Sequence, residues 1–164
     1  MTAIRSNPED VTFSAIQNSA LGAVILWEFC LHYEKEKQAG PTLLLVMPIL
    51  PLIFNAHATS AIFKRKMSGG LFRAINEDRS LVAGLQSRMV KMADQTFESI
   101  NLGLASGLIG YDSESAKLAT IRKSVPDGFD YSDAENMRFA AKRLGIWFAD
   151  LPIDQLSFML NLRF

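Results

Sequence analysis

Apolar residues recur every three or four positions along most of the chain, which is the spacing of an amphipathic helix. The first such stretch predicts a helix that begins near Asn18-Ser19, a plausible cap, and ends at about Lys37. Its apolar positions are Leu21, Val24, Ile25, Leu26, Phe29, Cys30 and Tyr33. Such a broad stripe indicates burial against two neighbouring elements. The polar residues 1–13 predict a flexible N-terminal arm, and residues 14–164 a single helical domain.

Residues 43–54 form the most apolar run of the chain. Because nearly every side of this run is apolar, we expect it at the centre of the core. Pro48 and Pro51 remove helical hydrogen bonds, so the run is either one kinked helix or two short helices that meet near Met47-Pro48. It is shorter than the ~20 residues that a helix needs to cross a bilayer, and we expect no contact with a membrane.

Residues 79–123 show the order helix, helix, hairpin. The apolar positions at helical spacing are Leu81, Leu85, Met89 and Met92, followed by Phe97, Ile100 and Leu104. Gly107 suits the left-handed position that ends a helix. Asp112-Ser113-Glu114-Ser115 is a polar turn between two short predicted strands. This order is typical of a winged-helix module.

The remaining helices are expected at residues 58–67, 71–78, 132–150 and 153–160. Ser68-Gly69-Gly70 predicts a hinge between the first two. Ser132 or Asp133 caps the third, and Leu151-Pro152 ends it. The expected fold class is mainly α with one small β-hairpin (α+β), with a winged-helix-like central module.

The charge balance argues against a chain that grips nucleic acid over its whole surface. Basic and acidic residues are equal in number, at 17 each among 164 residues. The single cysteine, Cys30, excludes an internal disulfide and a cysteine-based zinc site within one chain. A reducing, cytoplasmic location fits this cysteine usage.

The sequence shows no set of residues arranged for catalysis. Cys30, His32 and His57 are the one grouping that suggests a thiol nucleophile or a metal site. Positions 30 and 32 lie on different faces of a helix, and a buried structural cysteine is the commoner state. We expect His57 to cap a helix or lie on the surface. Walker, GxSxG, HExxH and dinucleotide-binding motifs are absent from the sequence. We therefore predict a protein that is not an enzyme and has no cofactor and no metal.

Residues 61–91 carry a local excess of positive charge. Their basic residues are Lys64, Arg65, Lys66, Arg73, Arg79, Arg88 and Lys91. Seven basic residues against Glu77 and Asp78 leave an excess of five charges. These seven are the candidate contacts to phosphates or to an acidic partner surface. An ordinary solvated helical face is the other interpretation.

A winged helix that reads DNA carries basic side chains on its second helix. Residues 93–107 contain no lysine or arginine but include Asp94 and Glu98. Because these carboxylates would repel phosphates, we expect the module to dock a protein. A stand-alone winged-helix DNA-binding regulator is the alternative function.

Several short stretches carry a family resemblance by their order and spacing. They are Asn18-Ser19-Ala20-Leu21-Gly22, Leu50-Pro51-Leu52, Leu81-Val82-Ala83-Gly84 with Arg88, Gly107-Leu108-Ile109, Arg143-Leu144-Gly145 with Trp147-Phe148-Ala149, and Leu160-Asn161-Leu162-Arg163. Together they resemble the middle component of bacterial three-component ABC systems, the group that includes Lamassu-type defence loci. The resemblance covers about residue 15 to the end. Asn55 and Asn161 depart from it, where a histidine and a glycine are expected.

The resemblance implies a non-catalytic accessory, or adaptor, subunit of an anti-phage or anti-plasmid defence complex. Such a subunit would link an SMC-like ABC ATPase to an effector, often a nuclease, and restrain the effector until foreign DNA is sensed. The implied partners are the ATPase and the effector, with DNA contact inside the complex. No active-site residue carries over from the family.

Overall fold

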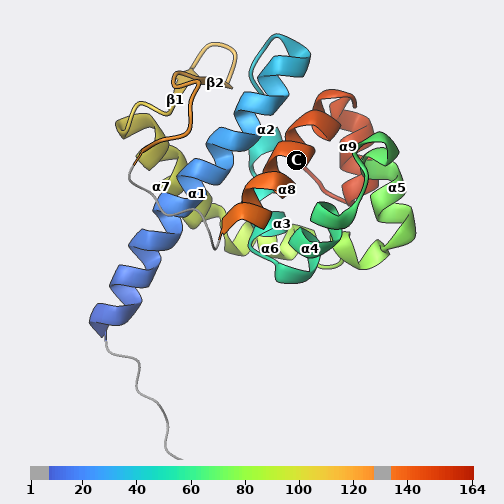
Figure 1. The fold of residues 1–164 in the computed structure, drawn as a ribbon, viewed down its shortest axis with the longest axis horizontal. Coiled ribbons are helices and arrows are strands. Elements are labelled where there is room, and N and C mark those ends of the chain that lie inside the picture. Colours follow the sequence, from blue (N-terminus) through green and yellow to red (C-terminus); the bar gives the residue numbers. More distant parts are fainter. Residues whose placement is uncertain (1–7, 128–133) are drawn as a thin grey trace, which may run out of the picture.

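The long helix α1 (Pro8–Lys37) is the element against which most others pack. The structure, a computed structural model, describes residues 8–127 and 134–164. Helices α7 (Ala93–Ala105) and α8 (Glu135–Ala149) share most of their contacts with α1 (Figure 1). The broad apolar stripe is confirmed, since Ile25, Leu26 and Phe29 of α1 are completely buried. The stripe is buried against two neighbouring elements, as predicted, because α7 and α8 both pack against α1.

Helix α1 begins ten residues before the predicted start. Pro8 stands at its first position, where a missing N–H costs nothing. Asn18 and Ser19 lie inside the helix, so the prediction that they cap it is wrong. Ser19 instead donates a hydrogen bond of 3.1 Å to the Glu98 carboxylate on α7. Residues 8–13 of the predicted flexible arm are therefore helical, whereas residues 1–7 lie outside the described part of the chain.

The apolar run forms two short helices, α2 (Leu43–Val46) and α3 (Ile49–Ile53). Of the two predicted alternatives, the break near Met47-Pro48 is thus the one observed. All five residues of α3 are buried in the core, as expected, whereas α2 buries Leu45 and Val46 but leaves Leu44 47% exposed. Within the described residues, no single helix is long and apolar enough to cross a membrane. Leu43–Ile53 and Ala56–Lys64 pass that test only as a pair, with a bend of 100° between them.

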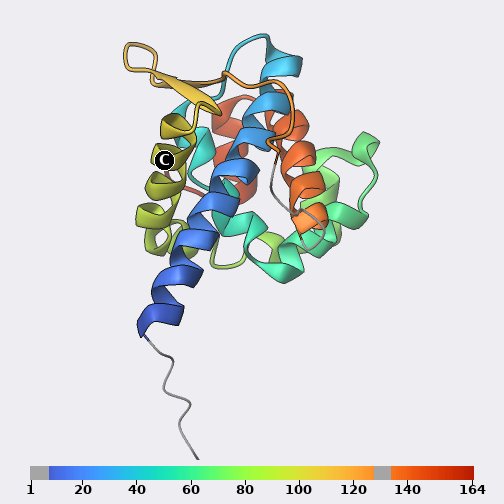
Figure 2. The same cartoon turned by 60° about the vertical axis from the view of Figure 1, so that its left-hand side comes forward.

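A series of short helices follows: α4 (Ala56–Lys64), the 3-10 turn η1 (Met67–Gly69), α5 (Gly70–Glu77), the 3-10 turn η2 (Arg79–Val82) and α6 (Leu85–Lys91). The break predicted at Ser68-Gly69-Gly70 is confirmed as η1 and the start of α5. The single helix predicted through Leu81 and Met92 is divided, because Gly84 adopts a left-handed conformation with φ of 67°. Helices α4 and α5 lie on the side of α1 opposite to α7 (Figures 1 and 2).

Helix α7 leads into the hairpin of β1 (Ile109–Asp112) and β2 (Lys117–Thr120). The strands are antiparallel, with Ile109 opposite Thr120. Gly107 has the predicted positive φ, at 72°. The fold class is confirmed: the described residues are mainly helical, with one two-stranded hairpin. The winged-helix arrangement is not confirmed and stays a prediction. Helix α7 packs chiefly along α1, and its contacts with α6 are few.

The C-terminal part contains α8 and α9 (Ile153–Leu160), separated at Leu151-Pro152 as predicted. The predicted caps Ser132 and Asp133 lie outside the described residues. Helix α8 approaches α1 very closely at Gly145: a Cβ atom at this position would lie 2.6 Å from the Phe29 carbonyl oxygen. Glycine at position 145 therefore permits the two helix backbones to meet.

Candidate functional site

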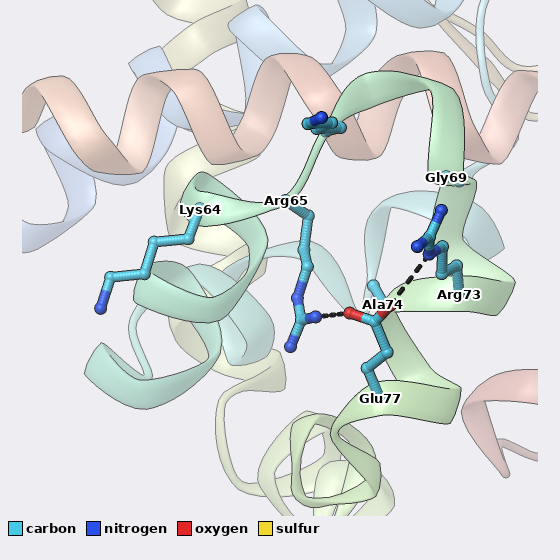
Figure 3. A pocket seen from close by; sticks show the side chains of 8 residues that line it. Lys64, Arg65, Gly69, Arg73, Ala74 and Glu77 are labelled. Atoms are coloured by element: carbon cyan, nitrogen blue, oxygen red, sulfur yellow. Dashed lines mark hydrogen bonds and ion pairs between the residues drawn. The ribbon is translucent and has the colours of Figure 1, made fainter.

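Four of the seven predicted basic residues lie together in the structure. Lys64, Arg65, Lys66 and Arg73 line one hollow of about 270 Å³, which we call the basic groove (Figure 3). Its other lining residues are Gly69, Gly70, Ala74 and Glu77. The groove lies between the end of α4, the turn η1 and one face of α5, so three sequence-adjacent elements build it.

Helix α8 holds this part of the chain in place. The Arg143 guanidinium donates hydrogen bonds to the backbone carbonyls of Ile62, Phe63 and Arg65, where α4 ends. One turn later, Trp147 Nε1 donates to the Met67 carbonyl at 3.1 Å. Carbonyls at a helix C-terminus lack partners within the helix and attract a cation. Arg143 and Trp147 therefore fix the backbone that carries the cations of the groove.

Among the described residues that line the groove, Glu77 is the one acidic residue. Its carboxylate forms an ion pair with Arg65 and accepts a hydrogen bond of 2.9 Å from Arg73 Nε (Figure 3). Four basic residues and one acidic residue leave a local excess of three positive charges. Lys64 and Lys66 are exposed, and no ion pair among the described residues involves them. The groove is therefore suited to bind an anion.

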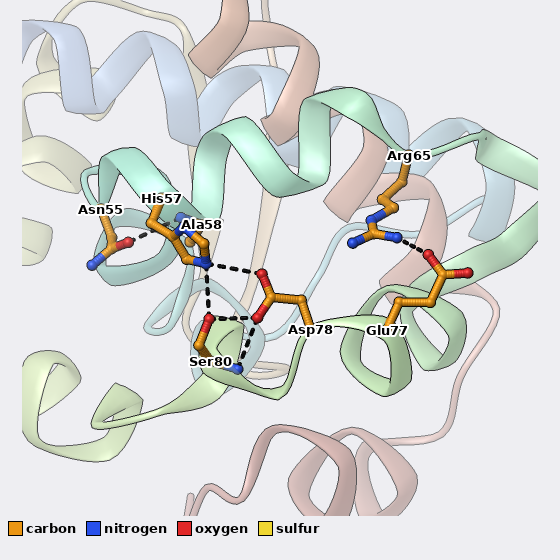
Figure 4. A network of polar contacts seen from close by, with 7 residues as sticks. All are labelled: Asn55, His57, Ala58, Arg65, Glu77, Asp78 and Ser80. Atoms are coloured by element: carbon orange, nitrogen blue, oxygen red, sulfur yellow. Dashed lines mark hydrogen bonds and ion pairs between the residues drawn. The ribbon is translucent and has the colours of Figure 1, made fainter.

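A second hollow, of about 350 Å³, adjoins the groove and shares Lys64 and Arg65 with it. Here His57 Nε2 lies 2.8 Å from Asp78 Oδ2 and 2.8 Å from Ser80 Oγ (Figure 4). Hydrogen bonds from Ser80, and then from His57, hold the pKa of the Asp78 carboxyl below its usual value. The contacts join the start of α4 to the start of η2. His57 lies at the surface, as predicted, but the cap of α4 is Asn55, which accepts from the Ala58 N–H.

Serine, histidine and aspartate, the residue types of a catalytic triad, meet in this cluster, but their arrangement is not that of a triad. In a triad the serine and the carboxylate contact different nitrogens of the imidazole. Here Ser80 and Asp78 both contact Nε2, and the Ser80 hydroxyl donates to Asp78 Oδ1. This geometry therefore lacks the relay from serine through histidine to the carboxylate, and the contacts of the cluster join α4 to η2.

The model of the family described as ABC-three component (ABC-3C) system Middle Component 3 matches residues 6–164. The chain belongs to this family. Neither the curated proteins nor the solved structures gave a match. The resemblance to a middle component is thereby confirmed, and a middle component of a multi-component ABC system implies partner proteins.

The other three predicted contact residues of this middle component lie outside the basic groove. Arg88 donates to the carbonyls of Pro51, at 3.3 Å, and Ala83, at 2.7 Å, so its guanidinium joins α6 to α3. Arg79 and Lys91 are exposed, and no ion pair among the described residues involves either. The predicted set is thus a groove of four residues, one structural arginine and two separate surface cations.

Cys30 is completely buried, as predicted, and burial raises the pKa of its thiol. His32 contacts the Glu28 carboxylate at 3.4 Å. Among residues 8–127 and 134–164, no group of three or more histidine, cysteine, aspartate or glutamate side chains is placed to hold a metal ion.

Sequence reasoning missed the parts played by Glu77 and Arg143. The spacing of Arg73 and Glu77, four residues apart, was a usable signal for their helical ion pair. Arg143 is about 80 residues from its carbonyl partners, and no local pattern indicates such a contact. Asn161, where the resemblance leads one to expect glycine, adopts a left-handed conformation with φ of 52°. Asparagine is the usual substitute for glycine there.

Proposed function

We propose that this middle component is a non-catalytic adaptor subunit that links the ATPase of its system to an effector. The proposal rests on the family match over residues 6–164. We further propose that the ATPase is SMC-like, that the effector is a nuclease, and that the complex is a cytoplasmic, Lamassu-type defence against phage or plasmid DNA. In this mechanism the subunit contributes surfaces for contact, and its polar side chains carry no bond-making step.

The outer face of α7 supports a docking role. Helix α7 buries Thr96, Ser99 and Ile100 against the core, while Phe97 and Leu104, which flank Ile100 at the edge of the buried side, are 43% and 37% exposed. These two residues are seven positions apart, which places them on one face of the helix. Exposed aromatic side chains are enriched at protein interfaces. We therefore propose α7 as the contact for one partner protein.

In the resting complex, the adaptor would hold the effector against the ATPase in an inactive arrangement. Sensing of foreign DNA by the complex would change the contacts at the adaptor and release the effector. This restraint requires that the adaptor touch two proteins at once. Helix α7 lies on one side of α1 (Figures 1 and 2), which leaves room for a second partner elsewhere on the fold.

Co-purification tests the proposal. A tagged chain expressed from its native locus should bring the ATPase and the effector with it in fixed ratio. Phe97→Asp should remove one of them, because a carboxylate would be buried in the interface without a partner. Ser113→Asp adds the same charge to an exposed position of the hairpin turn, away from α7, and serves as the matched control.

Recovery of the tagged chain without either protein would contradict the adaptor role. Tight duplex binding by the isolated chain, with no ATPase in the preparation, would favour the stand-alone regulator instead. Exposed Asp94 and Glu98 on α7 speak against duplex contact through that helix.

A further inference from the structure

We infer that the basic groove binds phosphate groups of a nucleic-acid backbone, and that Glu77 occupies the groove until the nucleic acid displaces it. The inference goes beyond the adaptor role. It assigns the chain a ligand of its own, whichever proteins it links.

The first observation is that two guanidinium groups from different elements point at the same carboxylate. Arg65 comes from the end of α4 and Arg73 from α5, and both contact Glu77 (Figure 3). The planar fork of arginine matches the oxygens of a carboxylate or a phosphate equally well. Glu77 therefore marks the place where an incoming phosphate oxygen would be received.

The second observation is that Glu77 does not neutralise the groove. Lys64, Arg65, Lys66 and Arg73 carry four positive charges, and Glu77 supplies one negative charge. The Arg73 side chain is 71% exposed and that of Glu77 is 40% exposed. Ion pairs this exposed contribute little to stability, so an external anion can replace Glu77 at small cost.

The walls of the groove favour phosphate over an acidic protein segment. Besides the charged residues, the described residues that line it are Gly69, Gly70 and Ala74, so this part of the chain gives it no large apolar side chain. Protein interfaces take much of their energy from aromatic and other large apolar anchors. Phosphate contacts need only cations and N–H groups. At Gly70, a Cβ atom would meet nothing within 4 Å, so a ligand backbone can approach there.

Binding of the full chain to a fluorescein-labelled 20-base-pair DNA duplex tests the inference. Fluorescence anisotropy would be recorded over a series of salt concentrations. If three or four phosphates are contacted, log K should fall with log salt at a slope of about −3. Replacing both Arg65 and Arg73 by alanine should weaken binding about tenfold and reduce the slope by about two. Arg79→Ala, which removes an exposed arginine outside the groove, is the matched control.

Glu77→Gln gives the sharper test, because its effect has the opposite sign. Removal of the competing carboxylate should tighten duplex binding about fivefold, whereas Glu114→Gln, the same charge change in the exposed hairpin turn, should leave it nearly unchanged. Circular dichroism of each variant checks that the fold is intact.

Three outcomes would overturn the inference. The first is duplex binding by the arginine double variant as tight as that of Arg79→Ala. The second is duplex binding by Glu77→Gln no tighter than that of Glu114→Gln. The third is displacement of the duplex by an unlabelled deca-glutamate peptide at a lower concentration than by unlabelled duplex. The last result would identify an acidic protein segment as the ligand. None of these outcomes contradicts the adaptor role, because that role is tested separately, by co-purification of the same variants with the ATPase.

Discussion

Glu28 is an acidic residue that is buried in the core of this middle component. It is 8% exposed, and its carboxylate contacts Arg138 at 3.2 Å and His32 at 3.4 Å. Burial raises the pKa of this carboxyl, but the hydrogen bond from His32 and the charge and hydrogen bond of Arg138 outweigh burial and lower it. The ionised form of Glu28 is thus preferred in the folded protein.

A lowered pKa makes the contribution of Glu28 to stability dependent on pH. The contribution is fully present above the pKa of the unfolded chain, about 4.3, and is lost as the pH falls through the lower pKa of the folded state. Glu28→Gln should therefore reduce the free energy of unfolding by about 2 kcal/mol at pH 7 and by much less at pH 3. Urea unfolding at both pH values measures this.

The control for this prediction is Glu36→Gln, an exposed position on the same helix, which should change the free energy of unfolding by less than about 0.5 kcal/mol. An equal loss for Glu28→Gln at both pH values would show that Glu28 acts through packing rather than through its charge.

At the scale of elements, the contact between α1 and α8 sets the shape of the molecule. Gly145 allows the two backbones to meet, and Phe148 packs edge to face on Phe29 with ring centroids 5.5 Å apart. The same helix α8 then presents Arg143 and Trp147 to the chain between α4 and α5. A displacement of α8 would therefore be transmitted to the basic groove.

Gly145→Ala tests this dependence. The added Cβ atom would lie 2.6 Å from the Phe29 carbonyl oxygen and 3.0 Å from the Tyr33 nitrogen, and neither backbone atom can turn aside. We expect a loss of about 2–3 kcal/mol in the free energy of unfolding, in the upper part of the range for overpacked cores. Thermal or urea unfolding measures it. Ser113→Ala in the exposed hairpin turn is the control, and equal stability of the two variants would contradict the close approach.

The sequence predicts the helices better than their ends or their contacts. The apolar stripe of α1 and the break at Pro48 follow from local physics, namely helical periodicity and the missing N–H of proline. The start of α1 does not, because Asn18 and Ser19 carry a cap preference that tertiary contact overrides: Ser19 bonds to Glu98, which is 79 residues away. The sequence predicts the basic residues as a group, but it does not predict that Arg88 donates to the backbone carbonyls of Pro51 and Ala83 instead of facing the solvent.

At the scale of the whole molecule, two surfaces are separated by the body of the fold. Helix α7, which carries Phe97 and Leu104, lies on one side of α1, and α4 and α5, which carry the cations of the basic groove, lie on the other (Figures 1 and 2). No residue of one surface lines the other. The proposed partner contact and the proposed phosphate contact should therefore be independent.

The double variant of Phe97→Asp and Arg73→Ala tests this independence. Phe97→Asp should leave duplex affinity unchanged within about twofold, Arg73→Ala should leave co-purification unchanged, and the combined variant should show both losses in full. Anisotropy and pull-down measure the two effects. A loss in the double variant well beyond the sum of the single ones would mean that the surfaces communicate through the core.

The bond from Trp147 to the Met67 carbonyl gives the molecule an optical probe of its own. The chain has two tryptophans, and Trp27 is the other, with its indole N–H on the Arg122 carbonyl. Replacing Trp27 by phenylalanine would leave a single emitter, seated beside the backbone that carries the groove cations. Any rearrangement of the chain around Met67, between α4 and α5, would then shift the emission maximum of Trp147, with no dye attached.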